Sequence, residues 1–147
     1  MKPVKPQQFA QGLQNFLNAI DDTNAKVAPF YSKLRTALND KTLSEMSDLD
    51  FKAILAEFMD ANDGYQRAAD HLSTLAAPVQ LLGLKSNLVD YFRAYVAATK
   101  DMTASLETNS KTVDLKKFSR SEQDQDDLMQ KINHTVNRIL TVPGLRG

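Results

Sequence analysis

The chain has 147 residues, of which 42% are hydrophobic and 24% are charged. This length and composition are those of an ordinary folded domain, so residues 1–147 are treated as a single domain and disorder is not expected. The 18 basic and 18 acidic residues balance, which disfavours nucleic-acid binding, and the absence of cysteine excludes disulfides, thiol nucleophiles and cysteine-bound zinc.

No segment of the sequence is typical of export or of membrane insertion. Lys2 and Lys5 lie near the start, but the apolar run that forms the centre of a signal peptide does not follow them. The purely apolar stretches are only a few residues long, whereas a membrane-spanning helix needs roughly 20. We therefore expect a soluble, cytoplasmic protein with no integral membrane segment.

The first predicted helix covers about residues 7–39. From Phe9 to Ala37 the apolar positions recur in steps of four and three, which places them on one face of an α-helix. Pro29 lies inside this series, and a proline removes one backbone donor and clashes with the preceding turn. Because the spacing continues in phase through Pro29, we expect a kink there and not two separate helices.

The second predicted helix covers about residues 48–77. Ser47 is its expected N-cap, with Asp50 three residues later in a pattern like a capping box. Pro78 is expected to end the helix, because the residue before a proline disfavours helical geometry.

The third and fourth predicted helices cover about residues 86–108 and 121–141. Ser86 or Asn87 is the expected cap of the third helix, and Ser121 that of the fourth. Residues 109–119 lose the helical period, so we expect a loop there. Four acidic residues then crowd the predicted start of the last helix, where the helix dipole favours negative charge: Glu122, Asp124, Asp126 and Asp127.

The apolar stripes on these helices are wider than the two positions in seven that a two-stranded coiled coil uses. Each helix should therefore contact at least two neighbours. The predicted fold is all-α, an up-down bundle of about four amphipathic helices.

A set of polar residues interrupts the apolar stripes. If the first two helices pair antiparallel through a short loop, Thr23 and Asn24 lie opposite Asn62 and near Gly64, and Thr99 reaches the same height. Two interpretations remain open. The layer is either a pocket for a small ligand or a device that fixes the helix register at some cost in stability.

Motifs for catalysis, metal binding and cofactor binding are missing from the sequence. Neither His71 nor His134 follows a glutamate at the spacing used in di-iron bundles, and no nucleophile elbow, phosphate-binding loop or dinucleotide fingerprint occurs. We expect no catalytic residue, no metal site and no cofactor, and hence no enzyme. A short basic stretch, Lys111, Lys116, Lys117 and Arg120, is more typical of a solvated loop than of a lipid or nucleic-acid contact.

Without catalytic motifs, the wide apolar stripes favour a non-catalytic protein-interaction or accessory protein, of bacterial or phage origin, that binds a protein partner or self-associates. One alternative is a bundle that binds a small molecule in the polar layer, so a small-molecule ligand is not excluded. A further alternative is a peripheral membrane binder that uses its amphipathic helices, although the basic rim that such binding needs is missing.

Overall fold

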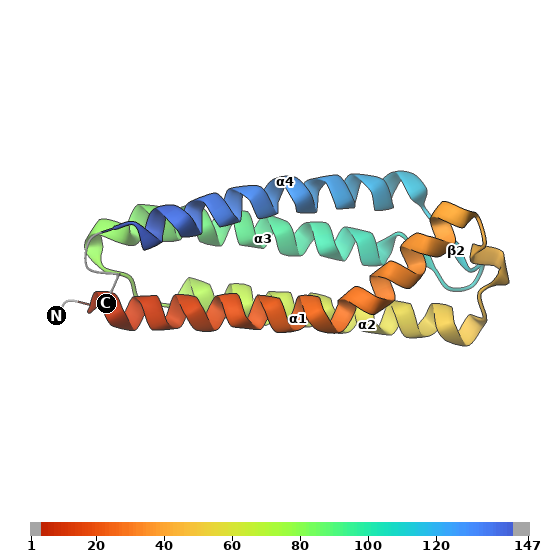
Figure 1. The fold of residues 1–147 in the computed structure, drawn as a ribbon, viewed down its shortest axis with the longest axis horizontal. Helices are drawn as coiled ribbons and strands as arrows, with labels where there is room; N and C mark the ends of the chain where they lie inside the picture. Colours follow the sequence, from red (N-terminus) through yellow and green to blue (C-terminus); the bar gives the residue numbers. More distant parts are fainter. Residues whose placement is uncertain (1–3, 143–147) are drawn as a thin grey trace.

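The computed structural model describes residues 4–142 of the chain. It confirms the predicted all-α bundle, because four long helices account for most of the described residues (Figure 1). These helices are α1 (Pro6–Asp40), α2 (Asp48–Thr74), α3 (Leu82–Ala104) and α4 (Leu115–Leu140). The connections contain two 3₁₀ turns, η1 (Leu43–Glu45) and η2 (Val79–Leu81), and two short strands, β1 (Leu106–Glu107) and β2 (Thr112–Val113).

The four helices run alternately up and down along the long axis of the molecule. Backbone contacts are extensive between α1 and α2, between α2 and α3, and between α3 and α4, whereas α1 and α4 lie further apart. Figure 1 shows α1 and α2 on one side of the bundle and α3 and α4 on the other. The first and last helices of the chain therefore form the loosest edge of the bundle.

α1 is one continuous helix that passes through Pro29. Figure 1 shows that it changes direction in its orange, C-terminal part, as the proline predicts. The side chain of Pro29 is exposed, so the lost hydrogen bond lies on the solvent side of the helix. α1 ends at Asp40, and the next residue, Lys41, has φ 58° and a backbone N–H that bonds back to the last turn.

α2 begins as predicted, because the Ser47 side chain accepts a hydrogen bond from the backbone N–H of Asp50 at 3.1 Å. It ends at Thr74, slightly before the predicted end at residue 77. Two hydroxyl groups compete for the carbonyls of the last turn: Ser73 Oγ donates to Asp70 O at 2.8 Å, and Thr74 Oγ1 to His71 O at 2.9 Å. Such local bonds weaken the continuation of a helix.

α3 begins at Leu82, four residues before the predicted start, so neither Ser86 nor Asn87 is its cap. Pro78 opens the 3₁₀ turn η2, in which the fully buried Leu81 anchors the chain, and α3 follows directly. The proline therefore starts a helical segment here, a position that its fixed φ suits. The same helix ends at Ala104, before the predicted end at 108.

α4 begins at Leu115, so the prediction of a loop over residues 109–119 is wrong in its second half. Its N-cap is Asp114, whose side chain accepts from the backbone N–H of Lys117 at 3.2 Å. β1 and β2 form a small hairpin just before it, and the hairpin turn contains Lys111 at φ 51°. Ser121 is not a cap but a buried residue inside α4 that donates to Ala98 O of α3.

The core is divided into two apolar clusters along the bundle. The larger lies toward the end where α1 begins and α4 ends, and the smaller toward the η1 and hairpin end. The larger cluster includes Phe9, Phe16, Leu72, Phe92 and Ile132. The smaller cluster includes Leu34, Phe51, Ile54, Phe58 and Phe118.

Candidate functional site: a mid-bundle pocket

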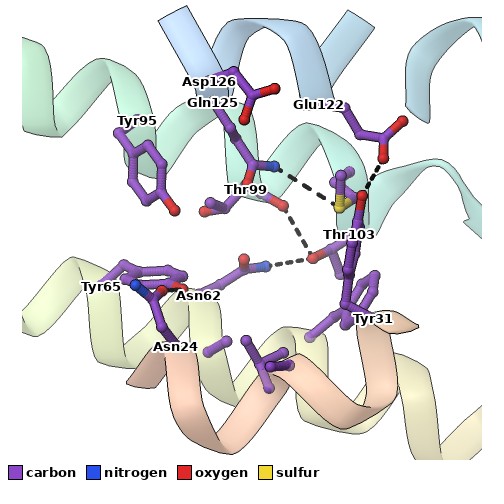
Figure 2. A pocket seen from close by; sticks show the side chains of 15 residues that line it. Asn24, Tyr31, Asn62, Tyr65, Tyr95, Thr99, Thr103, Glu122, Gln125 and Asp126 are labelled. Atoms are coloured by element: carbon purple, nitrogen blue, oxygen red, sulfur yellow. Dashed lines mark hydrogen bonds between the residues drawn. The ribbon is translucent and has the colours of Figure 1, made fainter. Parts of the chain in front are cut away.

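A pocket of about 320 Å³ lies between the two apolar clusters and is lined by residues from all four helices (Figure 2). Its volume is within the range of sites that hold small organic molecules. The lining residues are buried or half-buried except for Ala28 of α1 and Asp126 of α4, which are exposed. The pocket therefore opens to solvent along the loose edge between α1 and α4.

Three of the four polar residues singled out in the sequence line this pocket: Asn24, Asn62 and Thr99. Thr23 lies instead in a neighbouring groove between α1 and α2. Its hydroxyl donates to Ala19 O at 2.8 Å, and a Cβ at Gly64 would approach Thr23 Oγ1 to 3.0 Å. Gly64 thus allows α1 and α2 to approach closely at this point, and Thr23 is a packing residue there.

A chain of hydrogen bonds connects α2 and α3 across the floor of the pocket. Asn62 Nδ2 donates to Thr103 Oγ1 at 2.8 Å, and Thr103 Oγ1 donates to Thr99 O at 3.1 Å. Thr99 Oγ1 donates to Val96 O at 2.7 Å. Both threonine hydroxyls are therefore held by their own helix, and the Asn62 amide is fixed in one orientation (Figure 2).

Three tyrosines from three different helices line the pocket: Tyr31 of α1, Tyr65 of α2 and Tyr95 of α3. The Tyr65 hydroxyl donates to Asn24 Oδ1, and the Tyr65 and Tyr95 rings meet edge to face with centroids 5.4 Å apart. Burial raises the pKa of both hydroxyls. These tyrosines are therefore neutral near pH 7 and offer ring surfaces together with hydrogen-bonding hydroxyls.

The side of the pocket formed by α4 is acidic. Glu122 accepts a hydrogen bond from the Tyr31 hydroxyl and forms an ion pair with Arg35, whose Nη1 lies 3.4 Å from Glu122 Oε1. Burial, and then the hydrogen bond to Glu122, raise the pKa of Tyr31. Asp126 lies on the same side and takes part in none of the ion pairs found among residues 4–142.

Little in the sequence points to the aromatic and acidic lining. Tyr65 and Tyr95 occupy apolar stripe positions, which are typical of core residues, and Glu122 and Asp126 fit the predicted start of a helix. Because α4 begins at Leu115, both acids lie beyond its first turn, where the dipole has little effect. The signal that the sequence does contain is the position of Tyr65, three residues after Asn62 and therefore on the same face of α2.

Both histidines lie outside the pocket, with exposed side chains. Within residues 4–142 no group of three or more His, Asp or Glu side chains is arranged to hold a metal ion. None of the described helices combines the length and apolarity that crossing a membrane requires. No protein-family model, curated protein or solved structure matches the chain, so the geometry of the pocket has to support any functional proposal on its own.

Proposed function

We propose that this protein binds a small organic molecule in the pocket between its four helices, without catalysing a reaction. The observation that carries the proposal is the pocket of about 320 Å³ in the middle of the bundle, where a hollow interrupts an otherwise packed core. Native cores contain few voids larger than a water molecule. This pocket reaches into the middle of the bundle and opens to solvent between α1 and α4, so a ligand can enter and fill it.

The lining has the composition of a binding site. Apolar side chains such as Val27, Phe58 and Met102 form part of the wall, and a few polar groups converge from Asn62 and the tyrosines. Small-molecule sites combine apolar walls with a few fixed polar groups in this way. The polar groups of the layer also bond across helices, Asn62 to Thr103 and Tyr65 to Asn24, as a device that fixes the helix register would. The hollow beside them is the feature that such a device does not need.

The chemistry of the lining favours binding over catalysis. Activated nucleophiles in proteins have a general base within hydrogen-bond reach. The hydroxyl groups of Thr99 and Thr103 instead donate to backbone carbonyls, and the raised pKa of Tyr65 and Tyr95 keeps both hydroxyls protonated near pH 7, so neither acts as a general base. The Tyr31 hydroxyl does contact a carboxylate, Glu122, but the pKa of Tyr31 is raised as well, so this hydroxyl also keeps its proton. We therefore propose a binding protein and retain the cytoplasm as its expected location on sequence grounds.

The protein-interaction hypothesis stays a prediction. Within residues 4–142 the exposed large apolar side chains do not form one surface, because Leu49 and Leu115 lie at one end of the bundle, Val79 and Leu82 at the other, and Met59 in the middle of α2. Scattered exposed apolar residues are normal in proteins that bind no partner. The pocket is thus the more specific feature.

A thermal-shift screen of small organic molecules tests the proposed function, with a matched pair of variants to locate the site. Ala28→Phe places a ring at the pocket mouth, whereas Ala25→Phe places the same ring on an exposed part of α1 that does not line the pocket. We expect screen hits to stabilise the wild type and the Ala25→Phe variant but not the Ala28→Phe variant. A screen without hits, or hits that bind both variants equally, would contradict the proposal.

A further inference from the structure

The charged groups of the pocket lining have one sign. Glu122 and Asp126 belong to the lining, while no lysine, arginine or histidine does. Arg35 reaches Glu122 from outside the pocket and also lies over the Phe118 ring, 5.8 Å from its centroid, so its charge is already engaged. An anionic ligand would meet carboxylates and no cation, which is unfavourable in a partly buried site.

Asp126 is the carboxylate available to a ligand. Glu122 is held by Tyr31 and Arg35, but Asp126 has no ion-pair partner among the described residues. Figure 2 shows Asp126 on α4, on the side of the pocket opposite Asn24 of α1. Asp126 and Tyr95 line the same pocket, and after burial, which is the main cause, the negative charge of Asp126 also acts to raise the pKa of Tyr95.

The tyrosines add a second attraction for positive charge. The faces of aromatic rings carry partial negative charge and attract ammonium groups that lie within about 6 Å of the ring centroid. Tyr65 and Tyr95 meet at right angles, so a group beside one ring face lies close to the other ring. Tyr31 forms another wall and is kept in place by stacking on Phe118, at 6.2 Å between centroids.

The ligand also needs an apolar body, because a metal ion does not fit this lining. Hard cations require several oxygen ligands around one point, whereas Val27, Phe58 and Met102 occupy much of the wall here. Those side chains suit an aromatic or aliphatic group. The pocket therefore combines an apolar wall, tyrosine rings and, at its mouth, the Asp126 carboxylate, which has no ion-pair partner within residues 4–142.

We propose that the ligand is an organic cation, an ammonium group attached to an apolar body, with the ammonium between the tyrosine rings and Asp126. This inference rests on the proposed function and specifies the chemical class of its ligand. The apolar body packs against Val27, Phe58 and Met102, and the positive charge faces the opening between α1 and α4.

Phenyltrimethylammonium and its uncharged isostere tert-butylbenzene separate the contribution of charge from that of size, and benzoate is the anionic probe. Isothermal titration calorimetry at low salt measures the affinity for each. We expect phenyltrimethylammonium to bind about tenfold more tightly than tert-butylbenzene, which is the effect of one desolvated cation–π contact, and benzoate to bind more weakly than either.

Asp126→Asn is the decisive variant, and Asp124→Asn is its control, because Asp124 is exposed on the same helix and does not line the pocket. We expect Asp126→Asn to weaken phenyltrimethylammonium binding about threefold to tenfold and to leave tert-butylbenzene binding unchanged. Asp124→Asn should change neither affinity by more than about twofold, because salt and solvent screen its charge.

Each other outcome overturns a defined part of the proposal. If tert-butylbenzene or benzoate binds as tightly as the cation, or if Asp126→Asn has no effect, the inference about charge is wrong while the pocket remains a binding site. If none of the three probes binds, the inference is wrong. Combined with a screen that yields no hit, that result would remove the proposed function as well.

Discussion

The Tyr31 hydroxyl donates a hydrogen bond to the Glu122 carboxylate and so connects α1 to α4 at the edge where these helices lie apart. The ion pair between Arg35 and Glu122 supports the same connection. Both contacts lie beside the pocket mouth, so the strength of this junction should affect both stability and access to the pocket.

Tyr31→Phe removes the hydroxyl and keeps the ring that stacks on Phe118. A hydrogen bond to a charged group contributes about 1.5–3 kcal/mol, so we expect the free energy of unfolding to fall by roughly that amount in urea denaturation. Tyr91→Phe is the control, because Tyr91 is half-buried and its hydroxyl forms none of the side-chain hydrogen bonds found among residues 4–142. Equal effects of the two substitutions would show that the Tyr31–Glu122 bond contributes nothing to stability.

The buried tyrosine hydroxyls predict a loss of stability at alkaline pH. Burial raises the pKa of Tyr65 in the folded protein above its ordinary value of 10.0, so the folded state holds the proton more tightly than the unfolded state does. The contribution of protonated Tyr65 to the free energy of unfolding is therefore fully present below about pH 10, and it decreases as the pH rises above that value. Urea denaturation from about pH 8 to about pH 11 measures this loss.

The same titration on Tyr65→Phe isolates the contribution of this residue. We expect the variant to lose less stability than the wild type above about pH 10, because phenylalanine has no proton to release. Parallel curves for the two proteins would mean that Tyr65 titrates in the folded state as it does in the unfolded chain.

Two glycines inside helices should respond differently to substitution by alanine. Gly83 lies in the first turn of α3, and a Cβ added to it would have no neighbouring atom within 4 Å, so Gly83→Ala should stabilise the protein by about 0.5–1 kcal/mol. Gly64→Ala should gain less or lose stability, because its Cβ would lie 3.2 Å from Thr23 Cγ2.

Combining Gly64→Ala with Thr23→Ala tests this explanation, since the second substitution removes the obstructing side chain. We expect Gly64→Ala to be stabilising in that background, with a coupling energy of about 0.5 kcal/mol or more between the two sites in thermal denaturation. If the effects of the two substitutions on stability are additive, contact with Thr23 is not the reason why alanine at position 64 is unfavourable.

Phe92 links the core to the pocket, because its ring is fully buried and packs against Phe16, Tyr65 and Tyr95. Phe92→Ala should reduce the free energy of unfolding by about 3–5 kcal/mol through the cavity that it leaves. Leu115→Ala, at an exposed apolar position, should change it by less than about 0.5 kcal/mol. Similar values for the two variants in urea denaturation would contradict the core described here.

The helix interiors could be predicted from the sequence because their apolar positions repeat with the period of the helix. The start of α3 could not, because Pro78 is typical of a break and only the burial of Leu81 in the assembled core makes the 3₁₀ turn favourable. The start of α4 escapes prediction for a similar reason, since its first turn contains a single buried residue, Phe118, among exposed ones.

Part of the pocket lining follows from pairing the first two helices antiparallel, which brings Asn24 and Asn62 to the same height. The same pairing predicts Thr23 in the layer as well, but adjacent residues of a helix point about 100° apart, so Thr23 and Asn24 face different neighbours. The role of Tyr65 could not be predicted, because a tyrosine on an apolar stripe gives the same sequence pattern whether it belongs to a core or to a pocket wall.

The order of the helices along the chain determines where the bundle can open to let molecules enter and leave the pocket. Three of the neighbouring helix pairs are joined covalently by short connections, but α1 and α4 are the first and last helices of the chain and no connection joins them. α1 and α4 can therefore separate from each other without straining any of the turns that connect the helices. Wider opening of the pocket would break the contacts that Glu122 and Phe118 make with α1, and the other three helix pairs would stay packed.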